Sequence, residues 1–116
     1  MTSELSISVN PGPSDAVKVA VIGGEMDETN IDTLKAQLQG ILNDPAVKTL
    51  IFHLKDLDFI NSKGIGYLVS VHTHMAKDKR RLMVAEAQEA VMDVMNLIGL
   101  TSIIPYHATL EEALAA

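Results

Sequence analysis

The chain has 116 residues, a formal net charge of −6 and no cysteine. This length is typical of one domain, and a hydrophobic content of 47% is enough for one core. The lack of cysteine excludes disulfide bonds, thiolate metal ligands and a cysteine nucleophile, and the acidic balance argues against nucleic-acid binding, which usually needs a basic face.

The first residues do not resemble a targeting segment. Residues 1–9 lack the basic start and the continuous apolar stretch of a signal peptide. No apolar run in the sequence approaches the roughly 20 residues of a transmembrane helix. We therefore expect a cytoplasmic protein.

The first third of the chain predicts a β-hairpin followed by a helix. Apolar and polar residues alternate over residues 5–9 and 17–21, and a run of turn-forming residues separates the two segments. A helical periodicity then covers residues 31–42, with Thr29 or Asn30 as the N-cap.

The middle third predicts a strand, a loop and a second helix. Residues 47–54 are mostly apolar and partly β-branched, which is typical of a buried strand, and residues 55–60 are expected to be a loop. The second helix begins near Ser62. Its inner stripe is predicted to consist of Ile65, Leu68, Val69, His72, Met75 and Ala76.

The last third predicts two more strands and two more helices. A strand at residues 82–85 precedes a helix that starts near Gln88 and ends before Gly99, a residue suited to a helix C-terminus. A short strand is expected at residues 102–104. The sequence Thr109-x-x-Glu112 is a capping box for the final helix.

The predicted order of elements is β-β-α-β-α-β-α-β-α. After the opening hairpin, strands and helices alternate with short connections, which is typical of parallel strands with right-handed crossovers. We therefore predict an α/β fold with a mostly parallel sheet of about five strands and about four helices. The sequence contains no linker, internal low-complexity tract or convincing repeat, so we expect a single domain over residues 1–116.

Two loops of this predicted fold stand out as candidate sites. One holds residues 24–27 after the second strand, and the other holds residues 56–66 after the third. In open parallel sheets, functional sites gather in the loops beyond the carboxyl ends of the strands. Both of these loops lead into helix N-termini.

Ser62 lies where a helix N-cap is expected, directly before the apolar periodicity. As an N-cap it would contribute about 1 kcal/mol to stability. As a phosphorylation site it would place a phosphate at the positive end of a helix, adding about −1.5 to −2 charges without unfolding the helix. The neighbouring Gly64 and Gly66 permit either tight packing of the helix on the sheet or close approach of a partner, and the two interpretations are compatible.

These residues resemble the signature of STAS domains. In that family the loop commonly reads Asp-Ser-Ser/Thr-Gly-Leu/Ile-Gly, and here the corresponding sequence is Asn61-Ser62-Lys63-Gly64-Ile65-Gly66. A second family element, Gly-Glu-Leu-Asp, is similar to Gly24-Glu25-Met26-Asp27. The resemblance extends over nearly the whole chain, because the order and lengths of the predicted elements also match.

The resemblance implies an anti-sigma factor antagonist that acts as a phosphorylation-controlled switch between partners. Such proteins bind an anti-sigma factor that is also a serine kinase of the histidine-kinase ATPase type. Phosphorylation of the signature serine breaks that complex, and a PP2C-type phosphatase restores it. By resemblance, Ser62 is the phosphoacceptor, Asp27 is the acidic residue beside it, and the partner surface comprises Asp27, Asn61, Ser62, Lys63, Gly64, Ile65 and Gly66. The implied protein is not an enzyme and needs no cofactor.

Two residues depart from the family pattern. Asn61 stands where the family usually has Asp, and Lys63 stands where it usually has Ser or Thr. Together they make the loop two charges more positive than an Asp-Ser-Ser sequence. Lys63 could partly neutralise a phosphate on Ser62, or it could pair with acidic residues of a divergent kinase and so contribute to specificity.

Several other kinds of site have weaker support in the sequence. His72 and His74 are two residues apart on a predicted helix, so they do not share a face as metal-binding pairs do. Asp27, Asp56 and Asp58 could hold Mg²⁺ but are more simply solvated acids facing a partner. Gly64-x-Gly66 is not a dinucleotide-binding motif, and the loop is not the Gly-x-Ser-x-Gly of hydrolases.

Three alternatives to the switch remain open. The same fold could serve as a STAS adaptor or scaffold that is never phosphorylated, or it could bind nucleotides weakly. A metal-dependent enzyme would need the carboxylates of Asp27, Asp56 and Asp58. A receiver domain is disfavoured, because the chain opens with a hairpin and has no lysine after the last predicted strand.

Overall fold

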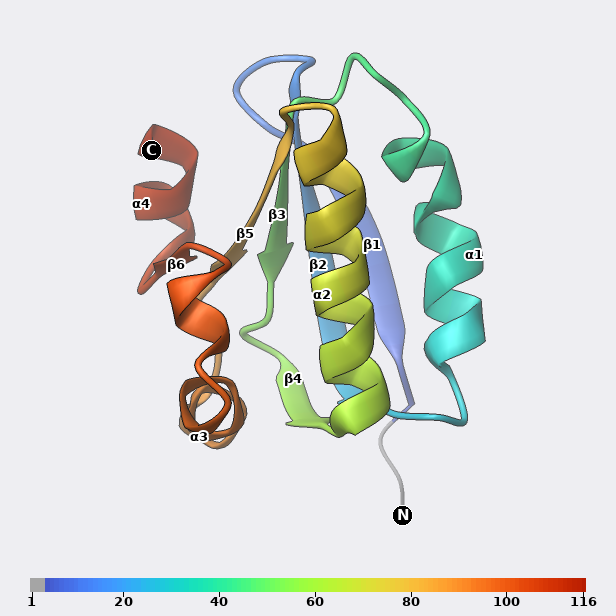
Figure 1. The fold of residues 1–116 in the computed structure, drawn as a ribbon, viewed down its shortest axis with the longest axis vertical. Coiled ribbons are helices and arrows are strands. Elements are labelled where there is room, and N and C mark those ends of the chain that lie inside the picture. The colour runs from blue at the N-terminus through green and yellow to red at the C-terminus, as the bar shows by residue number, and fades with distance from the viewer. Residues whose placement is uncertain (1–3) are drawn as a thin grey trace.

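The computed structural model describes residues 4–116 as an α/β fold with one mixed sheet and four α-helices, which confirms the predicted fold class (Figure 1). The elements are β1 (Ser6–Pro11), β2 (Val17–Met26), α1 (Ile31–Leu42), β3 (Thr49–His53), β4 (Leu57–Ile60), α2 (Ser62–Lys77), β5 (Arg81–Ala85), α3 (Glu89–Leu97), the 3-10 helix η1 (Leu100–Ser102), β6 (Tyr106–His107) and α4 (Leu110–Ala115). None of these helices is long and apolar enough to cross a membrane.

The order of the strands follows from their connections. β1 and β2 form the predicted antiparallel hairpin, with Pro11 paired to Lys18 beside the turn. The sheet continues from β2 to β3, β5 and β6, and these neighbours are all parallel. Helices connect them, as parallel strands require, because a short turn cannot bring the chain back to the starting edge.

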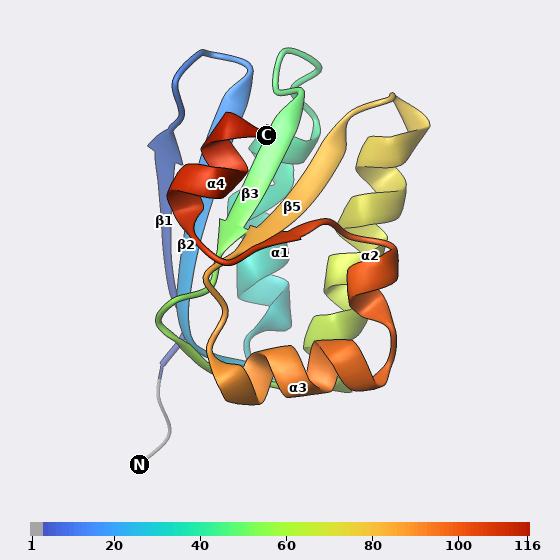
Figure 2. The same ribbon diagram turned by 90° about the vertical axis from the view of Figure 1, so that its left-hand side faces the viewer.

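The central strands bury side chains on both faces of the sheet. Leu50 and Phe52 on β3 face the core beneath α1, α2 and α3, whereas Ile51 faces the other way. Ile51 packs with Met83 of β5 and Ala113 of α4. Figure 2 shows α4 on the opposite side of the sheet from α1 and α2. Burial on both faces explains why β3 is almost continuously apolar in sequence.

The loop predicted at residues 55–60 contains a strand, and this part of the prediction is wrong. β4 pairs in parallel with the end of β2, which continues beyond the predicted residue 21 to Met26. The register shifts between Gly24 and Glu25. Gly24 has a φ of +87°, and a Cβ there would overlap the carbonyl oxygen of Glu4, so the irregular pairing depends on glycine. Leu57 and Ile60, at the two ends of β4, are buried, whereas Asp58 and Phe59 between them are exposed. This pattern lacks the alternation of a regular strand.

The short strand predicted at residues 102–104 is also wrong. Gly99 adopts the left-handed conformation at the end of α3, with a φ of +72°, and the 3-10 helix η1 follows at once. Ile103 is 52% exposed while Ile104 is buried. The edge strand β6 comes two residues later, after Pro105, whose carbonyl accepts a hydrogen bond from Val84 of β5. The isoleucine pair resembles a strand in sequence, but the turn after Gly99 occupies that position.

The inner face of α2 is rotated relative to the predicted stripe. Gly64, Leu68, Val71 and Met75 face the sheet at helical spacing, and Val69 is 37% exposed. The buried face also includes Ile65 and Tyr67. Of the predicted stripe, Ile65, Leu68 and Met75 are buried, whereas Val69 and Ala76 are exposed and His72 is partly exposed. The apolar periodicity misses Gly64 and Tyr67, because it gives little weight to glycine and tyrosine.

Glu86 joins α4 to the sheet. It follows β5 with a φ of +54°, and its Oε1 accepts a hydrogen bond of 2.7 Å from the backbone N–H of Leu110, the first residue of α4. Its Oε2 lies 3.4 Å from Nε2 of His53 on β3. The hydrogen bond from Leu110, assisted by His53, lowers the pKa of the Glu86 carboxyl below its ordinary value.

We expect Glu86→Gln to lower the melting temperature at neutral pH, with a smaller effect in acid. Because folding lowers the pKa of this carboxyl, its ionised form stabilises the fold above the ordinary value of 4.5. That contribution is lost as the pH falls through the folded pKa. Thermal unfolding followed by circular dichroism across this range measures the difference. Asp93→Asn, at an exposed position of α3, is the control. If the difference in melting temperature between wild type and Glu86→Gln does not shrink in acid, the stabilising role of the ionised Glu86 carboxylate is contradicted.

Candidate functional site

The two segments singled out from the sequence, residues 24–27 and 56–66, lie next to each other at one end of the sheet, although both contain strand residues. β2 ends at Met26 and β4 at Ile60, and these two residues are paired in parallel. The carbonyl of Met26 accepts a hydrogen bond of 3.2 Å from the backbone N–H of Asn61. The loop of residues 27–30 and the start of α2 therefore leave the sheet side by side, at the carboxyl ends of parallel strands, where functional sites gather.

The N-cap of α2 is Asn61, so the prediction that Ser62 has this role is wrong. Asn61 Oδ1 accepts hydrogen bonds from the backbone N–H groups of Lys63 and Gly64, at 3.0 and 3.2 Å. Asparagine and serine are about equally good N-caps, so the sequence does not decide between two adjacent candidates. Ser62 is instead the first helical residue, and α2 does not need its side chain to begin.

The side chain of Asn61 also connects the two loops. Its Nδ2 donates a hydrogen bond to Oε2 of Glu28 in the loop that follows β2. An amide can accept from the helix and donate to a carboxylate at the same time, whereas an aspartate could only accept and would repel Glu28. Glu28 was not predicted as a site residue. No local pattern indicates it, because the contact joins residues 33 positions apart.

Asp27 fixes the shape of its own loop. Its Oδ1 accepts hydrogen bonds from the hydroxyl and the backbone N–H of Thr29, and these bonds lower the pKa of the Asp27 carboxyl. Asn30 is the N-cap of α1, but its side chain bonds within the loop: it accepts from Asp27 N–H at 3.1 Å and donates to the Glu25 carbonyl at 2.7 Å. The loop thus presents an ionised carboxylate beside the start of α2.

Gly64 and Gly66 have different roles in the structure. A Cβ on Gly64 would lie 2.6 Å from Cγ1 of Ile60 and 3.0 Å from Sδ of Met26, so this glycine lets α2 pack directly on the ends of β2 and β4. A Cβ on Gly66 would meet no atom within 4 Å. Of the two interpretations offered for this pair, tight packing therefore describes Gly64, and an open surface describes Gly66.

Ser62, Gly66 and Val69 lie on one exposed side of α2, which we call the outer face. Their spacing of four and three residues places them in line along the helix, and all three are exposed. The Ser62 hydroxyl forms no hydrogen bond with any other residue in the range 4–116. Lys63 is also exposed, whereas Ile65 is buried.

Phe59 and two aspartates lie close to the start of α2 in sequence. Phe59 is 46% exposed on β4, two residues before Asn61. The Asp58 carboxylate accepts a hydrogen bond of 3.3 Å from Gln88 Nε2, and the Asp56 carbonyl accepts one of 2.9 Å from Gly24 N–H. Over residues 4–116, no three histidine, aspartate or glutamate side chains are grouped so that they could hold a metal ion.

A comparison with protein families identifies the fold. The model for the STAS domain matches residues 9–113. The chain belongs to the STAS domain family. A relative from Bordetella bronchiseptica, named "Putative anti-sigma factor antagonist BtrV", is 26% identical over 102 residues, which cover 88% of this chain and 87% of that protein.

Solved structures of anti-sigma factor antagonists share this arrangement of elements. An anti-sigma factor antagonist from Mycobacterium paratuberculosis superposes with a TM-score of 0.83 at 23% identity, over 97% of this chain and 92% of that one. Unphosphorylated SpoIIAA gives 0.79 at 22% identity, over 94% and 93% of the two chains. The phosphorylated form of SpoIIAA from Bacillus superposes with a TM-score of 0.73 at 21% identity, over 95% of this chain and 97% of that one. The STAS resemblance is thereby confirmed by the family match, and these structures share the fold.

We expect Gly64→Ala and Gly66→Ala to change stability in opposite directions. The new methyl at position 64 would overlap Ile60 and Met26, and overpacking of this kind costs about 1–3 kcal/mol. The new methyl at position 66 meets open space, and alanine within a helix is more stable than glycine by about 0.5–1 kcal/mol. Urea unfolding measures both values. Equal effects of the two substitutions would contradict this placement of α2.

A double-mutant cycle tests the contact between Asn61 and Glu28. Asn61→Ala should lower the free energy of unfolding by about 1 kcal/mol through loss of the cap. Asn61→Asp keeps the cap acceptor but places a second carboxylate beside Glu28, so it should be tolerated better when Glu28→Gln is also present. Urea unfolding of the wild type, Asn61→Asp, Glu28→Gln and the double variant gives the coupling energy. A coupling of zero would show that the two side chains do not interact in solution.

Proposed function

We propose that this chain is an anti-sigma factor antagonist, a cytoplasmic partner-switching protein that is not an enzyme, with Ser62 as its phosphoacceptor. In the unphosphorylated state it sequesters an anti-sigma factor that is also a serine kinase of the histidine-kinase ATPase type. Phosphorylation of Ser62 breaks this complex, and a PP2C-type phosphatase restores it. Membership of the STAS family supports the proposal, as do the names of the relatives described above.

The observation that carries the proposal is the position of the Ser62 hydroxyl. It is exposed on the first residue of α2 and has no hydrogen-bond partner among residues 4–116. Because Asn61 already caps the helix, the hydroxyl is free to accept a phosphate without loss of a structural contact. A kinase therefore finds an accessible nucleophile on a rigid part of the fold.

A phosphate on Ser62 would change the charge of this surface without requiring a change of fold. It adds about −1.5 to −2 charges at neutral pH. The neighbouring loop already carries the ionised Asp27 and the acidic Glu28, which is bonded to Asn61. Phosphorylation would thus extend a negative surface, and acidic groups of a partner that packs closely there would meet like charge, which costs several kcal/mol.

The residues proposed from the sequence as the partner surface divide into two groups. Gly64 and Ile65 are buried, so we infer that they support the surface from beneath. Direct contact then falls to the exposed and partly exposed members, which are Asp27, Asn61, Ser62, Lys63 and Gly66. The exposed Val69 and Phe59 offer apolar area next to them.

Lys63 favours a second candidate function, that of a STAS adaptor which is never phosphorylated. Its ammonium group follows Ser62 directly and is exposed. It would partly offset a phosphate on that residue and so weaken an electrostatic switch. An adaptor would use the same surface to hold its partner under all conditions.

Phosphopeptide mass spectrometry of the protein isolated from its own cells under several growth conditions separates the two candidates. A phosphate on Ser62 whose occupancy changes with condition is the expected result. Ser70, exposed on the same helix, is the internal control for unspecific phosphorylation. Ser62 that stays unmodified in protein known to be complexed would favour the adaptor.

Substitutions at Ser62 provide the matching test of binding. Ser62→Asp should weaken binding of the kinase by about tenfold or more, through like-charge repulsion at the interface, and Ser62→Ala should preserve it. Both variants should keep the circular dichroism spectrum and melting temperature of the wild type, because the cap is Asn61. Equal binding by both variants would count against the switch.

A further inference from the structure

A recess lies between α1 and α2. It has a volume of about 260 Å³, slightly below the roughly 300–1,000 Å³ of ordinary ligand pockets, so only a compact molecule would fit. From α1 it is lined by Lys35 and Gln39, and from α2 by Tyr67, Ser70, Val71 and His74. Figure 1 shows the two helices side by side over the sheet.

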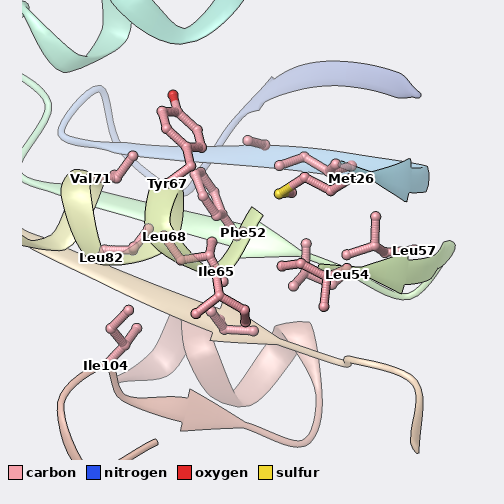
Figure 3. Packing of buried hydrophobic residues seen from close by; sticks show 14 of the residues in the cluster. Met26, Phe52, Leu54, Leu57, Ile65, Tyr67, Leu68, Val71, Leu82 and Ile104 are labelled. Carbon is pink, nitrogen blue, oxygen red and sulfur yellow. The ribbon is translucent and has the colours of Figure 1, made fainter. Parts of the chain in front are cut away.

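Tyr67 places an unpartnered hydroxyl at this recess. The residue is only 5% exposed, and its hydroxyl oxygen is buried without a hydrogen-bond partner among the described residues. In Figure 3 the Tyr67 oxygen points away from the other labelled side chains and toward α1. Buried polar atoms nearly always have a partner, so an unpartnered hydroxyl at the wall of a recess points to a polar ligand there.

The charge of the recess selects the kind of acceptor. Lys35 Nζ lies 6.0 Å from the centre of the Tyr67 ring, and none of the described residues that line the recess is acidic. Burial raises the pKa of the Tyr67 hydroxyl to about 12, so at neutral pH it keeps its proton and can donate it to an acceptor. A phenol donor beside an ammonium group matches an anion that accepts hydrogen bonds.

The remaining walls indicate a ligand with an apolar body. Val71 and the ring of Tyr67 provide apolar surface, and Leu42 at the end of α1 adds to it. His74 Nε2 lies 3.1 Å from the Leu42 carbonyl oxygen, so the imidazole links the two helices at this end of the recess. Lys35 is exposed, and its flexible side chain can move to admit a ligand.

We propose that this recess binds a small carboxylate with a compact apolar body, about the size of benzoate. The carboxylate accepts a hydrogen bond from the Tyr67 hydroxyl and pairs with the Lys35 ammonium, while the apolar body lies against Val71 and Leu42. This site is separate from the outer face of α2. The inference does not depend on the phosphorylation of Ser62.

Titration of the full chain with benzoate, followed by ¹H–¹⁵N NMR, tests the proposal. We expect saturable shifts of the Lys35, Tyr67 and Ser70 amide signals. Benzamide, which has the same shape without the charge, should bind about tenfold more weakly or worse. Tyr67→Phe and Lys35→Met should each weaken benzoate binding by about tenfold. Lys48→Met removes an exposed lysine outside the recess and should leave the affinity unchanged.

The stability of the free protein gives an independent reading. If the Tyr67 hydroxyl lacks a partner, Tyr67→Phe should leave the melting temperature unchanged or raise it, because removing an unsatisfied buried polar group costs nothing. A fall of several degrees would show that the hydroxyl is satisfied in the free protein and would overturn the proposal. So would the absence of saturable shifts with benzoate, equal binding of benzamide, or unchanged affinity in Tyr67→Phe.

Discussion

The contact of Gly64 with Met26 and Ile60 determines how α2 sits on the sheet. Without a Cβ at this position, the first turn of the helix rests directly on the ends of β2 and β4. The contact also sets the rotation of the helix, because Leu68, Val71 and Met75 follow Gly64 at helical spacing and face the same way. Because these residues face the sheet, Ser62, Gly66 and Val69 must face outward. The side of the helix that contains Tyr67 and Ser70 turns toward α1. Both functional proposals therefore depend on one glycine.

The departures from the STAS signature have different physical consequences. Asn61 keeps the oxygen that caps α2 and adds a donor that binds Glu28. The negative charge that the family usually carries at position 61 is thus present close by, in the adjacent loop. Lys63 has no such compensation, since it adds a positive charge next to Ser62. Of the two residues, Lys63 is the one that changes what a partner or a phosphate would experience.

The fold could be predicted from the sequence because its signals are local or periodic. The hairpin, the alternation of elements and the glycine after α3 all appear as patterns over a few residues. The errors arise where contacts distant in sequence decide the outcome. β4 exists because the irregular end of β2 accepts it as a partner, and α2 is rotated because Gly64 must meet Met26 and Ile60. In the site, both loops were found from the sequence, but the contact of Glu28 with Asn61 and the open hydroxyl of Tyr67 depend on packing that no sequence pattern reveals.

The spacing of residues on α2 places Lys63 beside Ser62 in sequence and on the same side of the helix as Tyr67. Lys63, Tyr67, Ser70 and His74 follow one another at intervals of four, three and four residues, so they share the side of the helix that faces α1. Lys63 is thus next to Ser62 in sequence and one turn before Tyr67 along the recess. One helical turn is about 5.4 Å long, which is shorter than the Debye length of about 8 Å at physiological salt. On the two proposals together, a carboxylate in the recess would reduce the positive potential around Lys63, and a phosphate on Ser62 would do the same from the outer face. Ligand and phosphate would then compete for the same positive charge, and each would weaken the interaction of the other with Lys63.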